Sequence, residues 1–267
     1  MWTRAAPRPK LRSTPPSLMM GEDMRRSERG TGAGSLAQDG RAGKSDGREL
    51  RRNQGALLSR RTLLVAAASC PALGARTLAQ GPLRLVALGD SLTAGFGLPA
   101  EASFPVMLQR ELAARGKAVT IANGGVSGDT AEDGLARLDW SVPKDTQGVI
   151  LELGANDALR GLDPKHCEAT LDQIIGTLKA RAIAVLLCGM QAPQNLGAEY
   201  VEAFDTIYPK LSAKYGLILY PFFLDGVAGD TALTLPDRLH PNAEGVRVIV
   251  SKILPVVESF VTKIETH

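Results

Sequence analysis

Four short polar segments of the chain contain residue types that act together in enzymes that attack acyl carbons. They are Gly89–Gly97, Asn123–Thr130, Gly154–Asp157 and Asp237–Asn242. Such chemistry needs a nucleophile, a general base, a group that orients the base, and hydrogen-bond donors for the oxyanion. Each segment offers a candidate for at least one of these tasks, so together they indicate acyl transfer through a serine.

Ser91 and His240 are the candidates for the nucleophile and the base. Among the three histidines, His166 stands beside charged residues at the start of an expected helix and His267 is the last residue. We therefore expect both of these to be solvated. Asp237 precedes His240 by three residues. In a turn, this spacing brings a carboxylate to the imidazole Nδ1 and leaves Nε2 for the serine.

Three hydrogen-bond donors from different segments are candidates for an oxyanion hole. They are the Ser91 N–H, the Gly128 N–H and the side-chain amide of Asn156. Taken one at a time, each residue has a plainer interpretation, because serine caps helices, glycine supplies positive φ angles and asparagine forms turns. Their joint occurrence in this order favours the catalytic interpretation.

Alternating strand and helix patterns fill residues 80–267, where all four segments lie. Apolar runs predict strands at Leu83–Leu88, Ala118–Ala122, Gly148–Leu153, Ile183–Leu187 and Leu217–Phe222. Helices are expected at Ser103–Arg115, Thr130–Asp139, Asp163–Ala180, Glu199–Tyr215 and Pro241–Lys263, with Pro241 in the first turn of the last one. This order predicts an α/β fold with a parallel sheet covered on both faces. The carboxyl ends of its strands then bring the polar segments to one edge.

The four segments resemble the four sequence blocks of the GDSL/SGNH hydrolases. The matching stretches are Gly89-Asp90-Ser91-Leu92, Ser127-Gly128-Asp129-Thr130, Glu152-Leu153-Gly154-Ala155-Asn156-Asp157 and Asp237-x-x-His240-Pro241-Asn242. The resemblance is closest to the bacterial periplasmic thioesterase I, arylesterase and lysophospholipase subgroup. It implies a flavodoxin-like three-layer α/β/α sandwich with strand order 2-1-3-4-5. It also implies a triad of Ser91, Asp237 and His240 and an oxyanion hole of Ser91, Gly128 and Asn156.

The activity that the resemblance implies is hydrolysis of small-molecule carboxylic esters, and of thioesters, through an acyl-serine intermediate without metal or cofactor. Two alternatives stay open. One is a carbohydrate O-acetyl esterase of the same fold. The other is a non-catalytic doubly wound ligand-binding module, since Gly95-x-Gly97-x-x-Ala100 matches a dinucleotide fingerprint. That match begins seven residues after the expected strand, and no acidic residue ends the second strand.

The same resemblance assigns substrate contacts to a further set of residues: Asp90, Gln191, Ala192, Pro193 and Leu239. The stretch 190–197 corresponds to a loop that covers the substrate in the subgroup. The resembling enzymes carry arginine, a bulkier aliphatic residue and tyrosine where this chain has Gln191, Ala192 and Leu196. These differences bear on acyl-chain preference and leave the chemistry unchanged.

The first 79 residues differ in composition from the rest. Residues 1–58 are rich in Gly, Arg, Ser and Pro, and we expect a disordered extension or an incorrectly assigned start, with Met19, Met20 and Met24 as alternative starts. Residues 59–79 resemble a twin-arginine signal peptide, because Arg60-Arg61 precedes the short apolar run Thr62–Leu73. A buried helix is the alternative interpretation. The signal predicts a periplasmic or secreted protein, with Cys70 as a weaker candidate for lipid attachment.

Composition and charge limit the other classes. Hydrophobic residues make up 44% of the 267 residues and charged residues 22%, which excludes a wholly disordered chain, a collagen-like fibre and a multi-span membrane protein. Residues 1–79 hold 15 Lys+Arg and 6 Asp+Glu, whereas residues 80–267 hold 16 and 22. The basic excess therefore gives no argument for a nucleic-acid partner. We expect a monomer or weak dimer. Cys167 and Cys188 are either a disulfide pair or separate thiols, with Cys188 as a small core residue.

Overall fold

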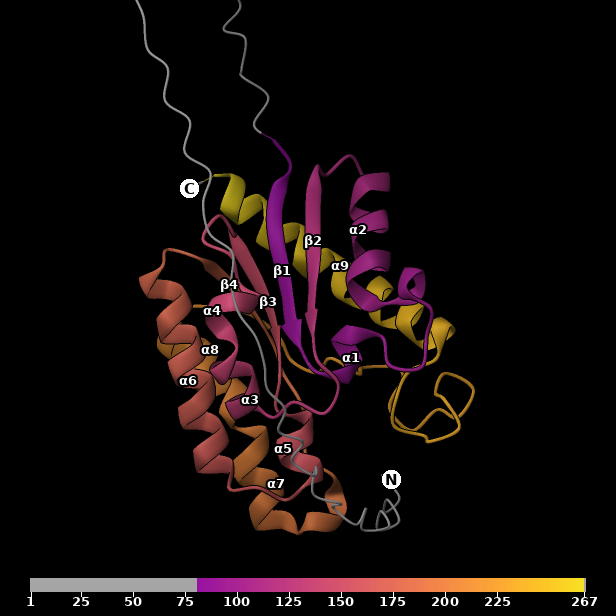
Figure 1. Cartoon of the computed structure of the whole chain (residues 1–267). Helices are drawn as coiled ribbons and strands as arrows, with labels where there is room; N and C mark the ends of the chain where they lie inside the picture. Colours follow the sequence, from indigo (N-terminus) through magenta and orange to yellow (C-terminus); the bar gives the residue numbers. More distant parts are fainter. Residues whose placement is uncertain (1–80, 267) are drawn as a thin grey trace, which may run out of the picture. The chain divides into compact units, whose positions relative to one another are not determined.

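A computed structural model of the protein describes residues 81–266 (Figure 1). Within this range, five parallel strands form one sheet in the order β2-β1-β3-β4-β5. The strands are β1 (Leu83–Gly89), β2 (Val119–Gly125), β3 (Gly148–Glu152), β4 (Ala184–Cys188) and β5 (Ile218–Tyr220). The parallel sheet and its strand order confirm the fold expected from the sequence.

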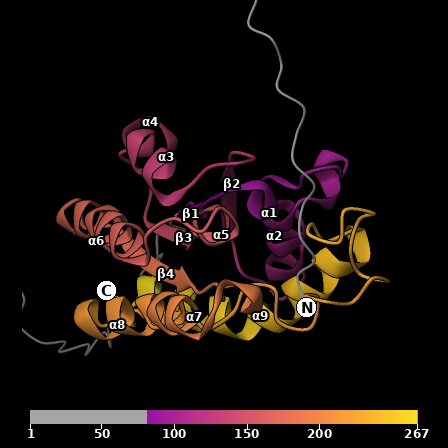
Figure 2. The same cartoon turned by 90° about the horizontal axis from the view of Figure 1, so that it is seen from below.

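Helices cover both faces of this sheet and complete a three-layer sandwich. The α-helices are α1 (Ser91–Ala94), α2 (Phe104–Ala114), α3 (Ala131–Ala136), α4 (Leu138–Ser141), α5 (Ala155–Leu159), α6 (Pro164–Ala180), α7 (Ala198–Asp205), α8 (Ile207–Tyr215) and α9 (Ala243–Glu265). Two short 3₁₀ helices, η1 (Ala100–Ala102) and η2 (Gln194–Leu196), lie in the connections. Helices α2 and α9 lie on one face, and α3, α6 and α8 lie on the other (Figure 2).

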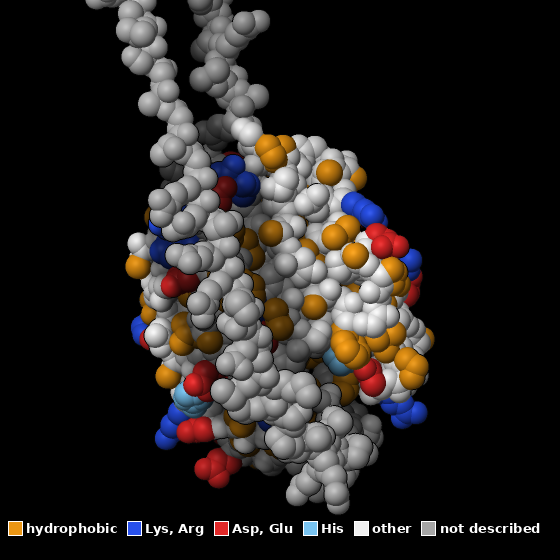
Figure 3. All heavy atoms as spheres, in the orientation of Figure 1, with side chains coloured by type: hydrophobic (Ala, Val, Ile, Leu, Met, Phe, Trp, Pro, Cys, Tyr) orange, Lys and Arg blue, Asp and Glu red, His pale blue; other side chains and the backbone are white. Residues whose placement is uncertain are grey.

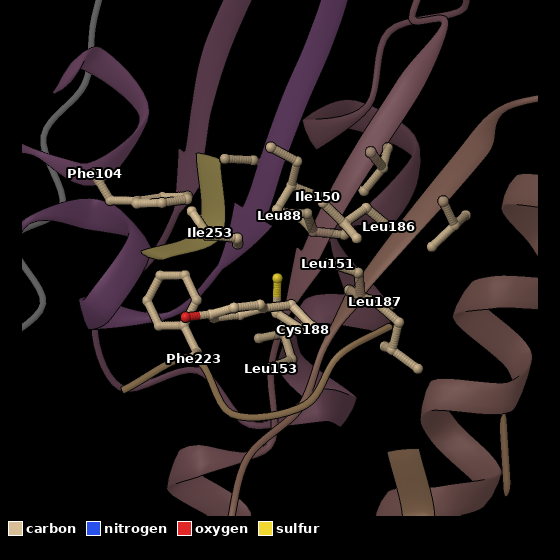
Figure 4. Close-up of a cluster of buried hydrophobic side chains, with 14 of the residues drawn as sticks. Leu88, Phe104, Ile150, Leu151, Leu153, Leu186, Leu187, Cys188, Phe223 and Ile253 are labelled. Carbon is tan, nitrogen blue, oxygen red and sulfur yellow. The ribbon is translucent and has the colours of Figure 1, made fainter. Parts of the chain in front are cut away.

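Apolar side chains from the sheet and both helix layers form the core. Leu88, Ile150 and Leu186 come from the three central strands, and Phe104 and Ile253 come from α2 and α9 (Figure 4). All five side chains are fully buried. Strand β3 is buried along its whole length, as a central parallel strand should be. The core thereby fixes the strand ends that carry the polar segments.

Several boundaries differ from the sequence-based expectation. Strand β2 runs on to Gly125, because Asn123–Gly125 pair with Ala87–Gly89 of β1 where a loop was expected. The helix expected at Thr130–Asp139 is two helices, α3 and α4, which meet at Arg137. The helix expected at Glu199–Tyr215 also breaks, at Thr206, since Pro209 has no N–H to donate to a preceding carbonyl.

The start of the last helix was also expected too early. Asn242 is the N-cap of α9, and its side-chain oxygen accepts hydrogen bonds from the N–H groups of Glu244 and Gly245 at 3.0 Å. Pro241 therefore lies outside the helix, where it forms an isolated bridge with Thr234. The position of Pro241 in the first helical turn was a wrong prediction.

The sequence-based expectations for the cysteines can be compared with the structure, whereas those for the N-terminal segments cannot. Cys167 and Cys188 are both buried free thiols, so the disulfide alternative does not hold. The extension 1–58 and the signal peptide 59–79 lie outside the described residues, as do Cys70 and His267. Across residues 81–266, none of the helices combines the length and the apolar character that crossing a membrane requires.

Candidate active site

Ser91 lies at the junction between β1 and the short helix α1. Strand β1 ends at Gly89, Asp90 caps α1, and Ser91 is the first residue of that helix. The Asp90 Oδ1 atom accepts a hydrogen bond from the Leu92 N–H at 2.9 Å, which fixes the turn. A Cβ atom on Gly89 would lie 2.1 Å from Thr93 Oγ1, so this close approach requires glycine.

His240 and Asp237 extend from Ser91 in a hydrogen-bonded chain. The Ser91 Oγ lies 2.9 Å from His240 Nε2, and His240 Nδ1 lies 2.6 Å from Asp237 Oδ2. In this arrangement the Ser91 hydroxyl donates to the imidazole, and the Nδ1–H donates to the carboxylate. The structure thus brings together the three residues that the sequence placed in a triad.

The turn that holds Asp237 and His240 is fixed by its own hydrogen bonds. The Asp237 Oδ1 atom accepts from the N–H groups of Leu239 and His240 at 2.9 and 3.1 Å. Arg238, which lies between Asp237 and Leu239, has a φ of +58°, a left-handed conformation that is uncommon outside glycine. Burial raises the pKa of Asp237, but the hydrogen bonds from Leu239 and His240 outweigh it and hold this pKa below its usual range. Asp237 therefore faces the imidazole as a carboxylate.

The three expected oxyanion donors come from the ends of β1, β2 and β3. Ser91 follows β1, Gly128 lies in the turn after β2 with a φ of +92°, and Asn156 lies in α5 after β3. The Asn156 Nδ2 donates to Asp90 Oδ2 at 3.0 Å and to the carbonyl of Asp129 at 2.9 Å. Asn156 thereby joins the residue before Ser91 to the residue after Gly128.

The backbone N–H groups of Ser91 and Gly128 have no hydrogen-bond acceptor among the described residues. Such unpaired donors at the start of a helix and in a glycine turn suit a ligand oxygen that carries negative charge. Asp90, which the family resemblance assigned to substrate contact, is fully buried, and its carboxyl group accepts hydrogen bonds from the Leu92 N–H and from Asn156 Nδ2. Its contact with substrate stays a prediction.

Glu152 is a second buried carboxyl group beneath this turn. Its Oε2 accepts hydrogen bonds from Thr93 Oγ1 at 2.7 Å and from the Asp90 N–H at 3.4 Å, whereas its buried Oε1 has no partner among the described residues. Burial is the main cause that raises the pKa of Asp90 to about 7. Burial also raises the pKa of Glu152 well above its usual range, and the negative charge of Asp90 adds to that shift. Neutral pH therefore favours a protonated carboxyl in this pair.

Phe96 is a neighbour of the site that the sequence reasoning did not single out. Its ring centroid lies 4.4 Å from that of His240, with the planes tilted by 36°. Phe96 is nevertheless 47% exposed. Figure 3 shows hydrophobic side chains gathered beside a histidine on the right of the view. The sequence signal that could have found Phe96 is its position directly after Gly95, in the polar segment that contains Ser91.

Other residues assigned to substrate contact lie on two loops. Ala192 and Pro193 are buried after β4, and the Ala192 N–H donates to Asp205 Oδ1 at 2.8 Å. Gln191 is exposed, and Leu239 is half-buried beside His240 in the chain. No hydrogen bond within the described range joins 191–193 to Ser91, so their contact with substrate stays a prediction.

The alternative interpretation as a dinucleotide-binding module can also be compared with the structure. Gly95 is the C-cap of α1, with a φ of +81°, so the Gly95-x-Gly97 segment ends a helix where a dinucleotide fingerprint would begin one. His166 is exposed and lies 3.3 Å from Glu132. Over residues 81–266, no group of three or more His, Cys, Asp or Glu side chains is placed to hold a metal ion.

Comparisons with known proteins identify relatives of this chain. The model of the GDSL-like Lipase/Acylhydrolase family matches residues 87–248. An arylesterase of Vibrio mimicus is 40% identical over 166 residues, which are 62% of this chain and 83% of that protein. Esterase TesA of Pseudomonas aeruginosa is 34% identical over 190 residues, which are 71% of this chain and 94% of that protein.

A solved structure supports the same assignment. The psychrotrophic esterase EstA from Pseudoalteromonas sp., inhibited by monoethylphosphonate, aligns with a TM-score of 0.64 and 28% identity. The alignment covers 67% of this chain and 98% of EstA. The family match, the two relatives and the shared fold lead to one conclusion: the chain belongs to the GDSL-like lipase/acylhydrolase family and is a carboxylic ester hydrolase.

Proposed function

We propose that Ser91 is the nucleophile of this esterase and that His240 is its general base. The Ser91 Oγ attacks the ester carbonyl carbon while His240 Nε2 takes the hydroxyl proton. The 2.9 Å separation between these two atoms is the observation that carries the proposal. Asp237 holds the imidazole by Nδ1 and stabilises the positive charge that develops on it.

The tetrahedral intermediate places its negative oxygen toward the Ser91 N–H, the Gly128 N–H and the Asn156 amide. Both N–H hydrogens of this amide are already engaged, so Asn156 gives up its bond to Asp90 Oδ2 for one to the oxyanion and keeps its bond to the Asp129 carbonyl. The absence of acceptors for the two backbone donors, among the described residues, supports this role. His240 then gives its proton to the leaving alcohol or thiol, and the carbonyl of an acyl-Ser91 ester re-forms. Water, activated by His240, attacks that ester and releases the carboxylic acid and free Ser91.

The proposed substrates are small acyl esters with an aryl or alkyl leaving group, and thioesters. The exposed ring of Phe96 gives an apolar surface next to the general base His240, which suits an acyl or aryl group. The relatives are named as an arylesterase, an esterase and a thioesterase 1/protease 1/lysophospholipase L1 of Escherichia coli. These names support a substrate range that includes aryl esters, acyl thioesters and lysophospholipids.

A substrate panel tests this proposal. Aryl esters, acyl-CoA thioesters and lysophospholipids of stepped chain length are assayed with the wild type and with Ser91→Ala, and an O-acetylated sugar is included. We expect turnover of aryl esters and loss of that turnover in the variant. Equal turnover by Ser91→Ala contradicts the assignment of the nucleophile. Turnover of the acetylated sugar and of no other substrate contradicts the proposed substrate class and indicates a carbohydrate O-acetyl esterase.

We further propose that the chain is exported and that residues 80–267 form the mature enzyme. The support is the sequence pattern of Arg60-Arg61 before a short apolar run and small residues. Mass spectrometry of the protein from its native host is expected to give a mature N-terminus near Gln80. An intact N-terminus in the cytoplasmic fraction contradicts this proposal.

A further inference from the structure

Arg137 is a buried arginine, at the junction of α3 and α4, whose guanidinium contacts three parts of the site. The residue is 6% exposed. Its Nε donates to Asp129 Oδ2 at 2.5 Å and its Nη2 donates to the Gly89 carbonyl at 2.8 Å. Its Nη1 donates to the Gly124 carbonyl at 2.8 Å and to Ser141 Oγ at 2.9 Å.

The acceptors of Arg137 adjoin all three proposed oxyanion donors. Gly89 lies two residues before Ser91, and Asp129 directly follows Gly128. The carbonyl of the same Asp129 accepts a hydrogen bond from Asn156 Nδ2 at 2.9 Å. The guanidinium of Arg137 thus connects the ends of β1 and β2 to Asp129, and the Asp129 carbonyl in turn accepts a hydrogen bond from the side-chain amide of Asn156 in α5.

We propose that Arg137 is a positioning residue for the oxyanion hole, which it holds in shape through Asp129 and the Gly89 carbonyl. It touches no reacting atom, so it acts through the donors. A planar guanidinium is suited to this task because its rigid fork fixes several acceptors at once. Oxyanion donors stabilise the intermediate only at a narrow range of distances, so a small shift of Gly128 or Asn156 lowers turnover.

The inference rests on the proposed roles of Ser91, Gly128 and Asn156, and it adds a residue that the family resemblance did not assign. Another arginine serves as a matched control. Arg181 Nη2 also donates to backbone carbonyls, those of Val142 and Pro143, at the far end of α6. Loss of Arg181 therefore removes hydrogen bonds to backbone carbonyls without touching Gly89, Gly124 or Asp129.

The test compares Arg137→Lys, Arg137→Ala, Asp129→Asn and Arg181→Ala in the full chain. Turnover of an aryl ester is measured per titrated active site, together with the affinities for an alkyl trifluoromethyl ketone and for the methyl ketone of the same length. The trifluoromethyl ketone forms an oxyanion when the serine adds to it, whereas the methyl ketone reports ground-state binding. For Arg137→Ala we expect kcat to fall about 10–100-fold with KM within about 3-fold, and trifluoromethyl ketone affinity to fall by a similar factor.

The variants separate the inference from folding and from the proposed function. Asp129→Asn keeps the backbone carbonyl of residue 129 and weakens only the ion pair with Arg137. It therefore tests the same link if Arg137→Ala does not fold, and a smaller loss of kcat is expected. Arg137→Lys is expected to restore only part of kcat, and Arg181→Ala to keep the wild-type kcat per titrated site. Normal kcat per titrated site in folded Arg137 and Asp129 variants overturns the inference. An active Ser91→Ala overturns the proposed function instead, whatever the Arg137 variants do.

Discussion

The Ser91 hydroxyl oxygen lies 2.9 Å from Nε2 of His240, although 149 residues separate the two in the sequence. Ser91 is placed by the end of β1, and His240 is placed by a turn whose last residues lead into α9. Because α9 packs on the same face of the sheet as α2, the turn before it is brought to the carboxyl edge of the strands. The packing of one helix thereby sets the distance between nucleophile and base.

Lowering the pH is expected to lower kcat/KM. Only a neutral imidazole accepts the Ser91 proton, and histidine side chains titrate at about pH 6.5 in model peptides. Asp237 stays ionised through this range, since the hydrogen bonds that it accepts outweigh its burial and keep its pKa below the usual value. A pH–rate profile with an aryl ester checks this. Activity that stays constant down to pH 4 would contradict a histidine base.

Asp237→Asn is expected to fold normally and to lose on the order of 10³–10⁴ in kcat. The asparagine oxygen still accepts from the N–H groups of Leu239 and His240, which preserves the turn. Its NH₂ group then faces Nδ1 and forces the imidazole proton onto Nε2, where it blocks acceptance of the serine proton. Circular dichroism and thermal melts serve as the folding control. A folded variant with wild-type kcat would rule out this orienting role.

Asn156→Ala is expected to reduce kcat far more than it raises KM. The amide acts on an oxyanion that exists only in the transition state and intermediate, and removal of one such donor costs about 10²–10³ in kcat. Loss of its bonds to Asp90 and Asp129 also lowers thermal stability. Turnover is therefore measured per titrated site. A less stable protein with normal turnover per site would make Asn156 a structural residue only.

Glu152→Gln is expected to weaken the dependence of stability on pH. The folded state holds the protons of Glu152 and Asp90 to higher pH than the unfolded chain does, so the free energy of unfolding falls as pH rises from about 4 through about 7. Glutamine keeps an acceptor for Thr93 and does not ionise. Between pH 5 and pH 8 the variant should lose less stability than the wild type.

Urea unfolding at several pH values measures this difference. Glu111→Gln, on the exposed side of α2, provides a control in which a glutamate without burial is neutralised. The control should follow the wild-type curve. Parallel curves for Glu152→Gln and the wild type would show that the buried carboxyl pair does not titrate in this range.

The proximity of Ser91, Asp237 and His240 could be predicted from the sequence, because Ser91 directly follows a strand and the other two lie in the turn before the last helix. Parallel strands place their carboxyl ends at one edge, so Ser91, Gly128 and Asn156 had to approach one another once the strands were recognised. The Asp237–His240 spacing then needed only a turn. The helices α1 and α5 were missed, since four or five residues are too few for periodicity to show.

The roles of Arg137 and Glu152 were not predictable in the same way. Arg137 lies in a segment that was expected to be one continuous helix, where an arginine ordinarily faces solvent. Its burial depends on three carbonyl or carboxylate oxygens that meet only in the folded sheet. For Glu152, the only sequence signal was a single charged residue in an otherwise apolar strand. This signal does not predict which groups the carboxyl group will contact.

Covalent labelling of the wild type with a reactive alkyl phosphonate tests the central claim most directly. The phosphonate should add once per chain, to Ser91, with loss of activity in proportion to labelling, and Ser91→Ala should stay unlabelled. Mass spectrometry of the intact protein and of its peptides measures both the stoichiometry and the site. A label on another residue, or full loss of activity with Ser91 unmodified, would contradict the assignment of Ser91 as the nucleophile.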